Sequence, residues 1–467
     1  MRTRGRRRPP ADDALNRLDA DLDGTLIRPG DPDYALHRAV WNGSIDRRPA
    51  LIVRCAGVAD VQAAVRFARE TDLEIAVRSG GHSFPGLSVV DDGVVIDLGA
   101  MKGVEVDAEA RTARVRAGVL LGEMDRATQA VGMAVPTGAV THTGVAGLTL
   151  GGGIGWLMRK HGLAIDQLRA ADLVTADGEV VRVSEEQHPE LFWGIRGGGG
   201  NFGIVTDFEF ALNPVGPTVL SVFALWPFEH AEGVSRYYRE WSAAVPEELT
   251  TALVMRRAPA LDIVPEHLHG QLVVGVVGCW AGPLEEGLAV VGPMRAFGSS
   301  AADLTAPRPF VEHQGLLDAS FPHGVWVYMK ACDVVELTDE VIDVSIEHAG
   351  RAVSPRSSVI AWQLGGRVAE MDGDATAFGS RDAGFIFNIS GITDGPEDFE
   401  QERTWVRDFF DALIPYQTSV YVNFLMEGGE ERVREAYGAQ RYDRLRALKA
   451  SWDPENVFHL NQNIPPA

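Results

Sequence analysis

The sequence has few cysteines, no long apolar run and no excess of positive charge. Its three cysteines, Cys55, Cys279 and Cys332, are far apart and form no CxxC pair, which argues against a disulfide framework or a cysteine metal site. No apolar stretch is long enough to span a bilayer, so a membrane partner is not expected. The formal net charge of -22 argues against nucleic acid as a partner, because that binding depends on a basic surface. The expected partner is therefore a small molecule.

The N-terminus lacks the pattern of a secretory signal. Residues 1–10 are rich in arginine, but no apolar stretch follows them. We predict a disordered basic tail over residues 1–19 and a cytoplasmic location. The remaining chain is too long for one ordinary core, because 467 residues predict two or three domains.

Glycine, in contrast, is abundant and clustered. One cluster, VRSGGHS at residues 77–83, follows a strand predicted at residues 74–77, so His82 is expected in a turn at the end of that strand. The two glycines before it let backbone N–H groups approach a ligand without a Cβ in the way. Arg78 adds a positive charge, and the combination suits a diphosphate beside an imidazole. A glycine turn that ends in histidine by chance is the alternative.

A second cluster, residues 136–156, contains seven glycines in twenty-one residues. A packed helix or strand disfavours so many glycines, whereas a backbone wrapped around a flat, charged cofactor requires them. A flexible linker is a weak alternative, because Val, Leu, Ile and Trp alternate with the glycines. His142 lies in this loop and is expected to face the cofactor as a structural hydrogen-bonding residue.

A third cluster spells GxGxxG at residues 198–203. The dinucleotide fingerprint must follow a strand and open a helix. Here a helix predicted at residues 189–195 precedes the motif and a strand predicted at residues 202–212 follows it. An NAD site is therefore not expected at this motif.

The glycine-rich composition ends at Asn213–Pro217, and this change predicts a domain boundary there. Beyond it, long strands and helices predict an antiparallel sheet with helices on one face. The strands are predicted at 218–226, 250–257, 270–280, 325–332, 357–364 and 384–391, and the helices at 231–244, 284–297, 338–352 and 397–413. Eight aromatic residues on these strands suit a flat ligand, although sheet core is the expected role of most. They are Phe223, Trp226, Trp280, Trp326, Tyr328, Trp362, Phe385 and Phe387.

Two features stand out near the C-terminus. A strand predicted at residues 419–424 would place Tyr421 and Asn423 on one face, since side chains alternate along a strand. Three side-chain amides, at residues 461–463, follow in a non-helical run.

Together these segments resemble the covalent flavoprotein oxidases of the vanillyl-alcohol oxidase/PCMH superfamily, in the berberine-bridge-enzyme-like branch. The resemblance covers the chain from about residue 24 to its C-terminus, and within the branch it is strongest to the bacterial 6-hydroxynicotine-oxidase-like and enterocin-pathway flavoenzymes. The segments that carry it are AVWNG (39–43) with RP (48–49), RSGGHS (78–83), GGGIG (151–155), LFWGIRGGGGNFG (191–203), YVN (421–423), DPEN (453–456) and NQNIP (461–465).

The resemblance implies an α+β fold. A PCMH-type FAD-binding domain of two subdomains is expected over residues 20–214, and a substrate domain with a helix-covered antiparallel sheet over residues 215–415. Residues 416–467 are expected to return to the FAD domain. The resemblance also implies covalent FAD, linked through His82 to the flavin 8α-methyl group. Many relatives add a cysteinyl link, but Val140 occupies that position, so we predict a single link and no large oligosaccharide substrate.

The resemblance further implies the site residues. Tyr421 and Asn423 are the candidate catalytic pair, and Lys330 and Gln363 are weaker candidates for substrate contact. A phenol acts as a base near neutral pH only where a positive charge or a donor favours its anion. The expected FAD contacts are Arg78, Ser79, Gly80, Gly81, His82, Ser83, Pro136, Thr137, Gly138, His142, Thr143, Gly144, Gly147, Leu148, Gly152, Gly153, Gly155, Trp156, Gly203, Ile204, Val205, Tyr421, Asn461 and Asn463.

The predicted activity is that of an FAD-dependent oxidase. It would oxidise an alcohol, amine or activated carbon of a small natural product, with hydride transfer to flavin N5 and reoxidation by O2. The alternatives are a flavin-dependent oxygenase or oxidative cyclase of secondary metabolism, and a dehydrogenase that uses another acceptor. A non-catalytic protein that binds flavin or an aromatic metabolite is the alternative of another class. The chain is expected to act as a monomer or homodimer.

Overall fold

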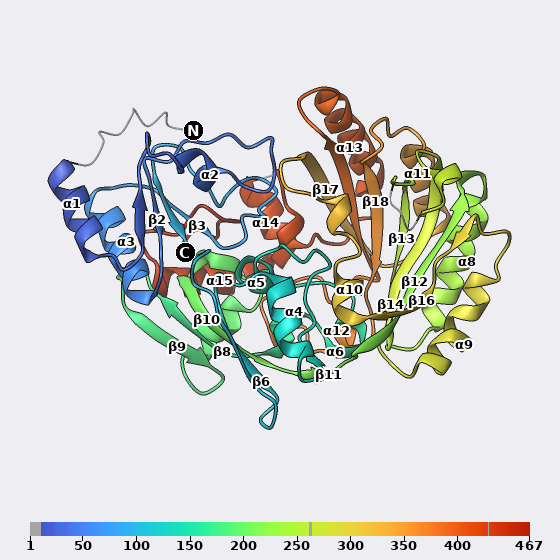
Figure 1. Cartoon of the computed structure of the whole chain (residues 1–467), viewed down its shortest axis with the longest axis horizontal. Helices are drawn as coiled ribbons and strands as arrows, with labels where there is room; N and C mark the ends of the chain where they lie inside the picture. The colour runs from blue at the N-terminus through green and yellow to red at the C-terminus, as the bar shows by residue number, and fades with distance from the viewer. Residues whose placement is uncertain (1–10, 261–263, 428) are drawn as a thin grey trace.

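The strands of the chain form four sheets within the residues that the computed structural model describes, 11–260, 264–427 and 429–467. Three of them determine the architecture, and the fourth is a two-stranded pair, β7 with β11. Figure 1 shows two lobes, one built from the first part of the chain and the other from its yellow and orange part. The α+β fold expected from the sequence is confirmed by the helices and the antiparallel sheets.

The first sheet has the order β1-β2-β4-β3, and both β2 and β3 run parallel to β4. Its central strands are buried and mainly hydrophobic, as is usual for parallel strands covered on both faces. The parallel strands end at Arg78 and Asp97, so the VRSGGHS loop leaves the sheet at its carboxyl edge. The elements are α1 (Asp12–Asp21), β1 (Thr25–Ile27), α2 (Tyr34–Arg38), β2 (Leu51–Arg54), α3 (Val58–Glu70), β3 (Ile75–Arg78) and β4 (Val94–Asp97).

The second sheet is antiparallel and has the order β5-β6-β10-β8-β9. The second and third glycine-rich segments lie in the connections between its strands, and each contains a short helix. Its strands are β5 (Val104–Asp107), β6 (Thr112–Arg116), β8 (Leu168–Val174), β9 (Val180–Ser184) and β10 (Ile204–Ala211). The intervening elements are α4 (Leu121–Gln129), β7 (Met133–Ala134), α5 (Val145–Leu150), α6 (Met158–His161), η1 (Ala164–Gln167), α7 (Pro189–Ile195), η2 (Gly199–Asn201) and β11 (Asn213–Pro214).

The third sheet has eight strands in the order β15-β12-β14-β13-β18-β19-β17, with β16 paired to β12. One face packs on α8, α11 and α13, and the other face packs on the first lobe. The strands are β12 (Thr218–Pro227), β13 (Leu249–Arg257), β14 (Leu272–Trp280), β15 (Ala302–Asp303), β16 (Ala306–Pro309), β17 (Trp326–Val334), β18 (Ser358–Gln363) and β19 (Phe385–Thr393). The helices are η3 (Phe228–His230), α8 (Ala231–Ala244), η4 (Glu266–Leu268), α9 (Leu284–Arg295), α10 (Phe310–Gln314), η5 (Asp318–Ser320), α11 (Asp339–Ala349), α12 (Arg367–Glu370), α13 (Phe399–Leu413) and η6 (Ile414–Tyr416).

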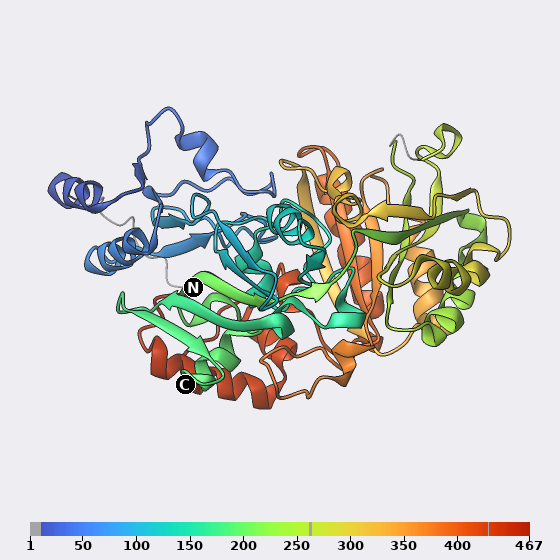
Figure 2. The ribbon, with the colours of Figure 1, turned by 60° about the horizontal axis from the view of Figure 1, so that its bottom comes forward.

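The C-terminal segment returns to the first lobe, where its red helices lie under the second sheet in Figure 2. It contains η7 (Val422–Phe424), α14 (Gly429–Tyr437) and α15 (Ala439–Trp452). Lys449 on α15 is fully buried, and its ammonium group donates to the carbonyl of Asn201 at 2.6 Å and forms an ion pair with Asp453 at 2.6 Å. This buried cation joins the third glycine loop to the end of the chain.

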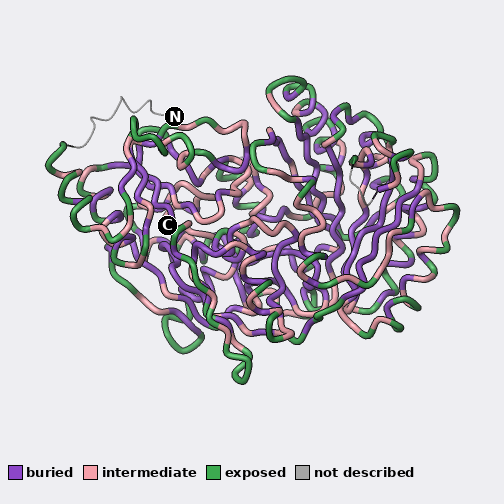
Figure 3. The backbone as a smooth tube through the Cα atoms, in the orientation of Figure 1, coloured by how far each residue is buried: buried purple, intermediate pink, exposed green. Residues whose placement is uncertain are grey.

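Two expectations from the sequence were wrong in their local structure. The tail predicted over residues 1–19 is helical from Asp12, since Leu18 of α1 is buried in the core of the lobe, and residues 1–10 lie outside the described part of the chain. The strand predicted over residues 419–424 is a single bridge from Ser419 to Asp333 followed by the turn η7. Figure 3 shows the buried backbone concentrated in the sheets of both lobes. No helix in the described residues is both long and apolar enough to cross a membrane.

Candidate functional site

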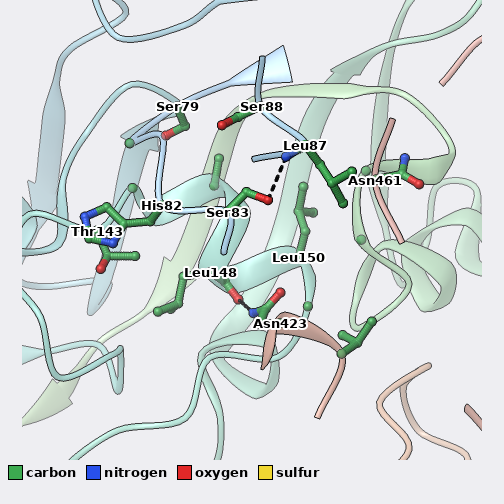
Figure 4. A pocket seen from close by; sticks show the side chains of 18 of the residues that line it. Ser79, His82, Ser83, Leu87, Ser88, Thr143, Leu148, Leu150, Asn423 and Asn461 are labelled. Carbon is green, nitrogen blue, oxygen red and sulfur yellow. Dashed lines mark hydrogen bonds between the residues drawn. The ribbon is translucent and has the colours of Figure 1, made fainter. Parts of the chain in front are cut away.

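A cavity of about 360 Å³ lies where the first lobe meets the eight-stranded sheet. Its lining comes from the three glycine-rich segments, from the C-terminal segment and from the sheet. Figure 4 shows His82 and Thr143 close together on one side of it and Asn461 on the opposite side. The lining includes sixteen of the residues expected from the sequence: Ser79, Gly80, Gly81, His82, Ser83, Gly138, Thr143, Gly144, Gly147, Leu148, Gly203, Ile204, Val205, Tyr421, Asn423 and Asn461.

The first two glycine segments are in direct backbone contact. A Cβ on Gly80 would lie 2.2 Å from the nitrogen of Gly144, and a Cβ on Gly144 would lie 2.3 Å from the nitrogen of Gly80. Only glycine fits at such a crossing. The crossing therefore fixes one end of the cavity beside His82.

His82 is held between an indole and a second imidazole. Its ring stacks on Trp41 with 4.9 Å between the ring centroids, and its Nε2 lies 2.7 Å from Nδ1 of His142. Burial, followed by the neighbouring rings of His142 and His323, lowers the pKa of His82 well below 6.5. His82 is therefore a neutral imidazole at pH 7, which is the form that can act as a nucleophile.

His82, His142 and His323 form a three-histidine cluster whose ring nitrogens lie within 4.8 Å of one another. Two nitrogens bound to one tetrahedral zinc ion at 2.0–2.1 Å would be about 3.3 Å apart. The 2.7 Å between His82 and His142 is shorter and is an ordinary hydrogen-bond distance. The geometry therefore favours a shared proton over a shared metal ion.

Several polar atoms at the cavity have no protein partner. Buried Ser88 Oγ and Asn461 Oδ1 line it without a hydrogen bond, and Asn463 Oδ1 is also buried and unpaired. Buried polar atoms are normally satisfied, so these atoms indicate a polar ligand. A Cβ on Gly147 or Gly200 would meet no atom within 4 Å, so the space beside these glycines is open. A long, flat molecule with polar groups, such as FAD, fits this lining.

Comparison with known proteins agrees with the geometry. Residues 49–184 match the FAD binding domain family, and residues 420–465 match the berberine and berberine-like family. An FAD-linked oxidoreductase from Dictyostelium discoideum is 31% identical over 457 residues, which are 97% of each chain. (R)-6-hydroxynicotine oxidase from Paenarthrobacter nicotinovorans is 31% identical over 473 residues, covering 95% of this chain and 97% of its own. The crystal structure of 6-hydroxy-D-nicotine oxidase from Arthrobacter nicotinovorans has a TM-score of 0.86 at 29% identity, covering 96% of this chain and 98% of that one.

The chain belongs to the berberine-bridge-enzyme-like family of FAD-linked oxidoreductases. It is an FAD-dependent enzyme of the oxidase type, as its resemblance had indicated.

In this FAD-linked oxidoreductase, nine of the expected cofactor contacts lie outside the cavity lining. They are Arg78, Pro136, Thr137, His142, Gly152, Gly153, Gly155, Trp156 and Asn463. Arg78 was expected to supply charge to a diphosphate, but its guanidinium forms a buried ion pair with Asp97 at 2.6 Å. Trp156 packs between His313 and Trp362 behind the cavity wall.

The two weaker substrate candidates also lie elsewhere. Lys330 is 3.6 Å from Glu427, beside the rings of Tyr328 and Phe410. Gln363 is buried in the sheet, where it accepts a hydrogen bond from Thr251 at 2.8 Å. Neither side chain lines the cavity, because the sheet directs both toward its helix-covered side.

Tyr421 and Asn423 do meet, although they are not on a strand. The amide of Asn423 donates to the phenol oxygen of Tyr421 at 2.8 Å and to the carbonyl of Leu148 at 3.0 Å. The N–H of Gly153 donates to the same phenol oxygen at 2.9 Å. Burial outweighs these donors and raises the pKa of Tyr421 to about 12.

Apart from Trp362, the sequence patterns did not indicate the lining residues from the substrate lobe. On that side the lining consists of Leu317, Phe321, Ile360, Trp362 and Asn388. Of the eight strand aromatics, only Trp362 reaches the lining described by the structure. Gln462 and Asn201 also line the cavity, and the amide run and the third glycine segment were the signals that pointed to them.

Proposed function

We propose that the enzyme holds FAD through a single covalent link to His82 and oxidises a small, flat, mainly apolar amine or alcohol. The observation that carries this proposal is the composition of the cavity. Away from the substrate lobe, the lining includes glycine backbone from three segments, apolar side chains and the unpaired oxygens of Ser88 and Asn461. The substrate side has four apolar residues and one amide. When bound, FAD supplies a hydride acceptor that O2 can reoxidise.

The substrate side disfavours a carbohydrate. A sugar carries many hydroxyl groups, and each needs a partner once it leaves water. Asn388 is the one side chain with an amide among the five residues of this side, and Leu317, Phe321, Ile360 and Trp362 are apolar. Aromatic and aliphatic walls instead match a planar apolar ring system.

The lining also disfavours chemistry that needs a strong base. Among the described residues, no Asp, Glu, Lys or Arg lines the cavity. With a pKa of about 12, Tyr421 stays protonated at neutral pH. A neutral amine can lose a hydride without prior deprotonation, whereas an alcohol must also lose its O–H proton. An amine is therefore the preferred substrate.

Val140 supports a single link. It lines the cavity near the three-histidine cluster, and its isopropyl group has no nucleophilic atom. His82 is then the nucleophile that the lining offers beside the crossing of the glycine segments.

The cofactor part of the proposal is tested by acid denaturation followed by mass mapping of the flavin-bearing peptide. We expect yellow precipitated protein with the flavin on the His82 peptide and none on the Val140 peptide. In His82→Ala the precipitate should be colourless, although the native variant still binds FAD. Flavin that leaves the wild-type protein in acid would refute the link.

The substrate part is tested by a peroxide-coupled screen of matched pairs, each an aromatic cyclic amine and the alcohol of the same skeleton, with an oligosaccharide as the negative control. We expect stoichiometric peroxide and faster turnover of the amines. Incorporation of labelled oxygen without peroxide would instead identify an oxygenase, and flavin reduction without reoxidation in air a dehydrogenase. A flavin that no compound reduces would identify a binding protein.

A further inference from the structure

We propose that His142 is a positioning residue for covalent attachment of the flavin: its Nδ1 accepts the Nε2 proton of His82 and so leaves the Nδ1 lone pair of His82 free to bond the cofactor. This inference rests on the proposed covalent FAD site. It assigns a role to a histidine that does not line the cavity.

The surroundings of His142 indicate which nitrogen of each imidazole carries the proton. The backbone carbonyl of Phe321 raises the pKa of His142, as a carbonyl does when a protonated ring nitrogen faces it. Since Nδ1 of His142 faces His82, the donor to this carbonyl is Nε2, and Nδ1 is left as an acceptor. The proton shared over the 2.7 Å contact therefore belongs to Nε2 of His82. The free lone pair of His82 is then on Nδ1, the only ring nitrogen left for the cofactor.

The carbonyl of Phe321 also positions Trp41, the indole that stacks on His82. Phe321 accepts a hydrogen bond from the indole N–H of Trp41 at 2.9 Å, and Trp41 stacks on His82. One carbonyl of the substrate lobe thus orients both neighbours of His82. The lobe that covers the cavity therefore also prepares the attachment site.

Exposed His323 offers a route to solvent for the proton that His142 receives from His82. His323 packs on His142 with 4.8 Å between the ring centroids, and its own side chain is exposed. The rings of His82 and His142 are both partly buried, and the third ring, that of His323, is exposed. A proton received by His142 can thus reach solvent without crossing the cavity.

The chemistry balances with the oxidant that the oxidase reaction already uses. One C–H bond of the 8α-methyl group and the Nε2–H bond of His82 break, and a C–N bond forms at Nδ1. Two electrons and two protons are released, and O2 takes them up as hydrogen peroxide. His142 receives the proton of His82, so the positive charge moves away from the reacting ring and toward exposed His323.

The charges around His142 keep it ready as an acceptor. His82 faces it from the first glycine segment, and His323 and Asp318 face it from the substrate lobe. Burial and His323 lower the pKa of His142, and they outweigh Asp318 and the Phe321 carbonyl, which raise it. The net pKa is below 6.5, so His142 is unprotonated at pH 7.

The test measures the rate at which flavin becomes covalently attached to the protein. Full-length chains from riboflavin-starved cells are mixed with FAD in air, and covalent flavin is measured over time by fluorescence in a denaturing gel. The variants are His142→Ala, His142→Asn and, as a neighbouring control, His323→Asn. Asparagine can accept the hydrogen bond of His82 but cannot take up its proton, so it separates orientation from proton transfer.

We expect His142→Ala to attach flavin at least tenfold more slowly than wild type, with His142→Asn between them and His323→Asn near wild type. Non-covalent affinity for FAD, measured before attachment, should stay within about twofold. Added imidazole should restore part of the rate of His142→Ala. The wild-type rate should fall as the pH drops below 6.5, and this fall should move to lower pH in His142→Asn. NMR of the flavin peptide should place the bond on Nδ1 of His82.

Attachment by His142→Ala at the wild-type rate would overturn the inference. A bond on Nε2 of His82 would overturn it as well, and so would a slower rate explained by weaker FAD binding and insensitive to imidazole. A wild-type protein that binds FAD but never links it would refute the proposed covalent site itself.

Discussion

The amide of Asn423 donates a hydrogen bond to the phenol oxygen of Tyr421 at 2.8 Å, across one intervening residue of the turn η7. With the N–H of Gly153, it gives this oxygen two donors. The phenol nevertheless remains protonated, because burial raises its pKa to about 12. The pair therefore joins the C-terminal segment to the second glycine segment, and does not provide a ready base.

Replacing Tyr421 by phenylalanine tests this assignment. The N–H of Gly153 and the amide of Asn423 would lose their acceptor in a buried place, which costs about 1–3 kcal/mol of stability. Turnover should fall by less than about tenfold, whereas loss of a general base costs about 10²–10⁴. Thermal unfolding and kcat with the best amine measure the two effects.

Tyr437→Phe is the matched control. Tyr437 is also buried and lines the cavity, and its phenol donates one hydrogen bond to the carbonyl of Gly197 at 3.1 Å. A hundredfold fall in kcat for Tyr421→Phe but not for Tyr437→Phe would restore Tyr421 as the base.

Local patterns in the sequence located the regular elements well. The helix predicted over residues 189–195 and that over residues 231–244 have the predicted limits, because helical apolar spacing ends where the next turn or proline begins. The strand predicted around Tyr421 was wrong, since a single bridge between Ser419 and Asp333 takes the place of a strand ladder there. Strand pairing depends on residues far away in the chain, which a short alternation cannot reveal.

Glycine spacing located the first-lobe wall of the cavity, but it did not show how Arg78 is paired or which residues cover the cavity. Arg78 was expected to bind a phosphate because the sequence alone does not show its partner. That partner is Asp97, which lies on the neighbouring parallel strand. Asn388 and Phe321 gave no signal, as each is an ordinary residue of the substrate lobe that the fold brings to the cavity. Apart from Trp362, the residues of the substrate side could therefore be identified only from the structure.

The two kinds of glycine in the cavity wall should respond differently to alanine. In Gly80→Ala the new methyl group would meet the backbone of Gly144, so the crossing must open and the protein should lose about 1–3 kcal/mol. In Gly147→Ala the methyl group meets no protein atom, and inside α5 alanine favours the helix. Gly147→Ala should keep or raise the unfolding temperature of the flavin-free protein while weakening FAD binding.

Calorimetric titration with FAD and unfolding of both flavin-free variants measure these effects. Equal FAD affinity for Gly147→Ala and wild type would show that the open space at Gly147 is not part of the cofactor site.

Asn388→Leu should change specificity. Ser390 donates to Oδ1 of Asn388, so the Nδ2 group is the part of the amide left to donate to a substrate. Loss of the Nδ2 donor should raise KM about tenfold for a substrate that places a hydrogen-bond acceptor beside residue 388. A tenfold change corresponds to one net hydrogen bond. An analogue without the acceptor should bind as well as before.

The KM ratio of the two analogues is the measurement. Ser390→Ala, which keeps the amide but frees its oxygen, is the control and should change the ratio less. A parallel rise in KM for both analogues would mean that the introduced leucine has merely altered the shape of the wall.

Asp125 should make the stability of the protein depend on pH between about 4 and 7. It is fully buried on α4, receives one hydrogen bond from Gln314 at 3.1 Å, and its Oδ1 has no partner. Burial raises the pKa of this carboxyl to about 7. The folded protein thus keeps a proton that the unfolded chain releases above about 3.8, and stability is lost as the pH rises through this window. Across the whole window, the free energy of unfolding should fall by about 4 kcal/mol.

Asp125→Asn removes the titrating group while its amide oxygen still accepts from Gln314. The unfolding temperature of the variant should exceed that of wild type by clearly more at pH 8 than at pH 5. Asp382→Asn, at an exposed aspartate, should show no such trend. A constant difference between Asp125→Asn and wild type from pH 5 to 8 would mean that the buried carboxyl is already charged at pH 5, and that the contact between α4 and α10 tolerates that charge.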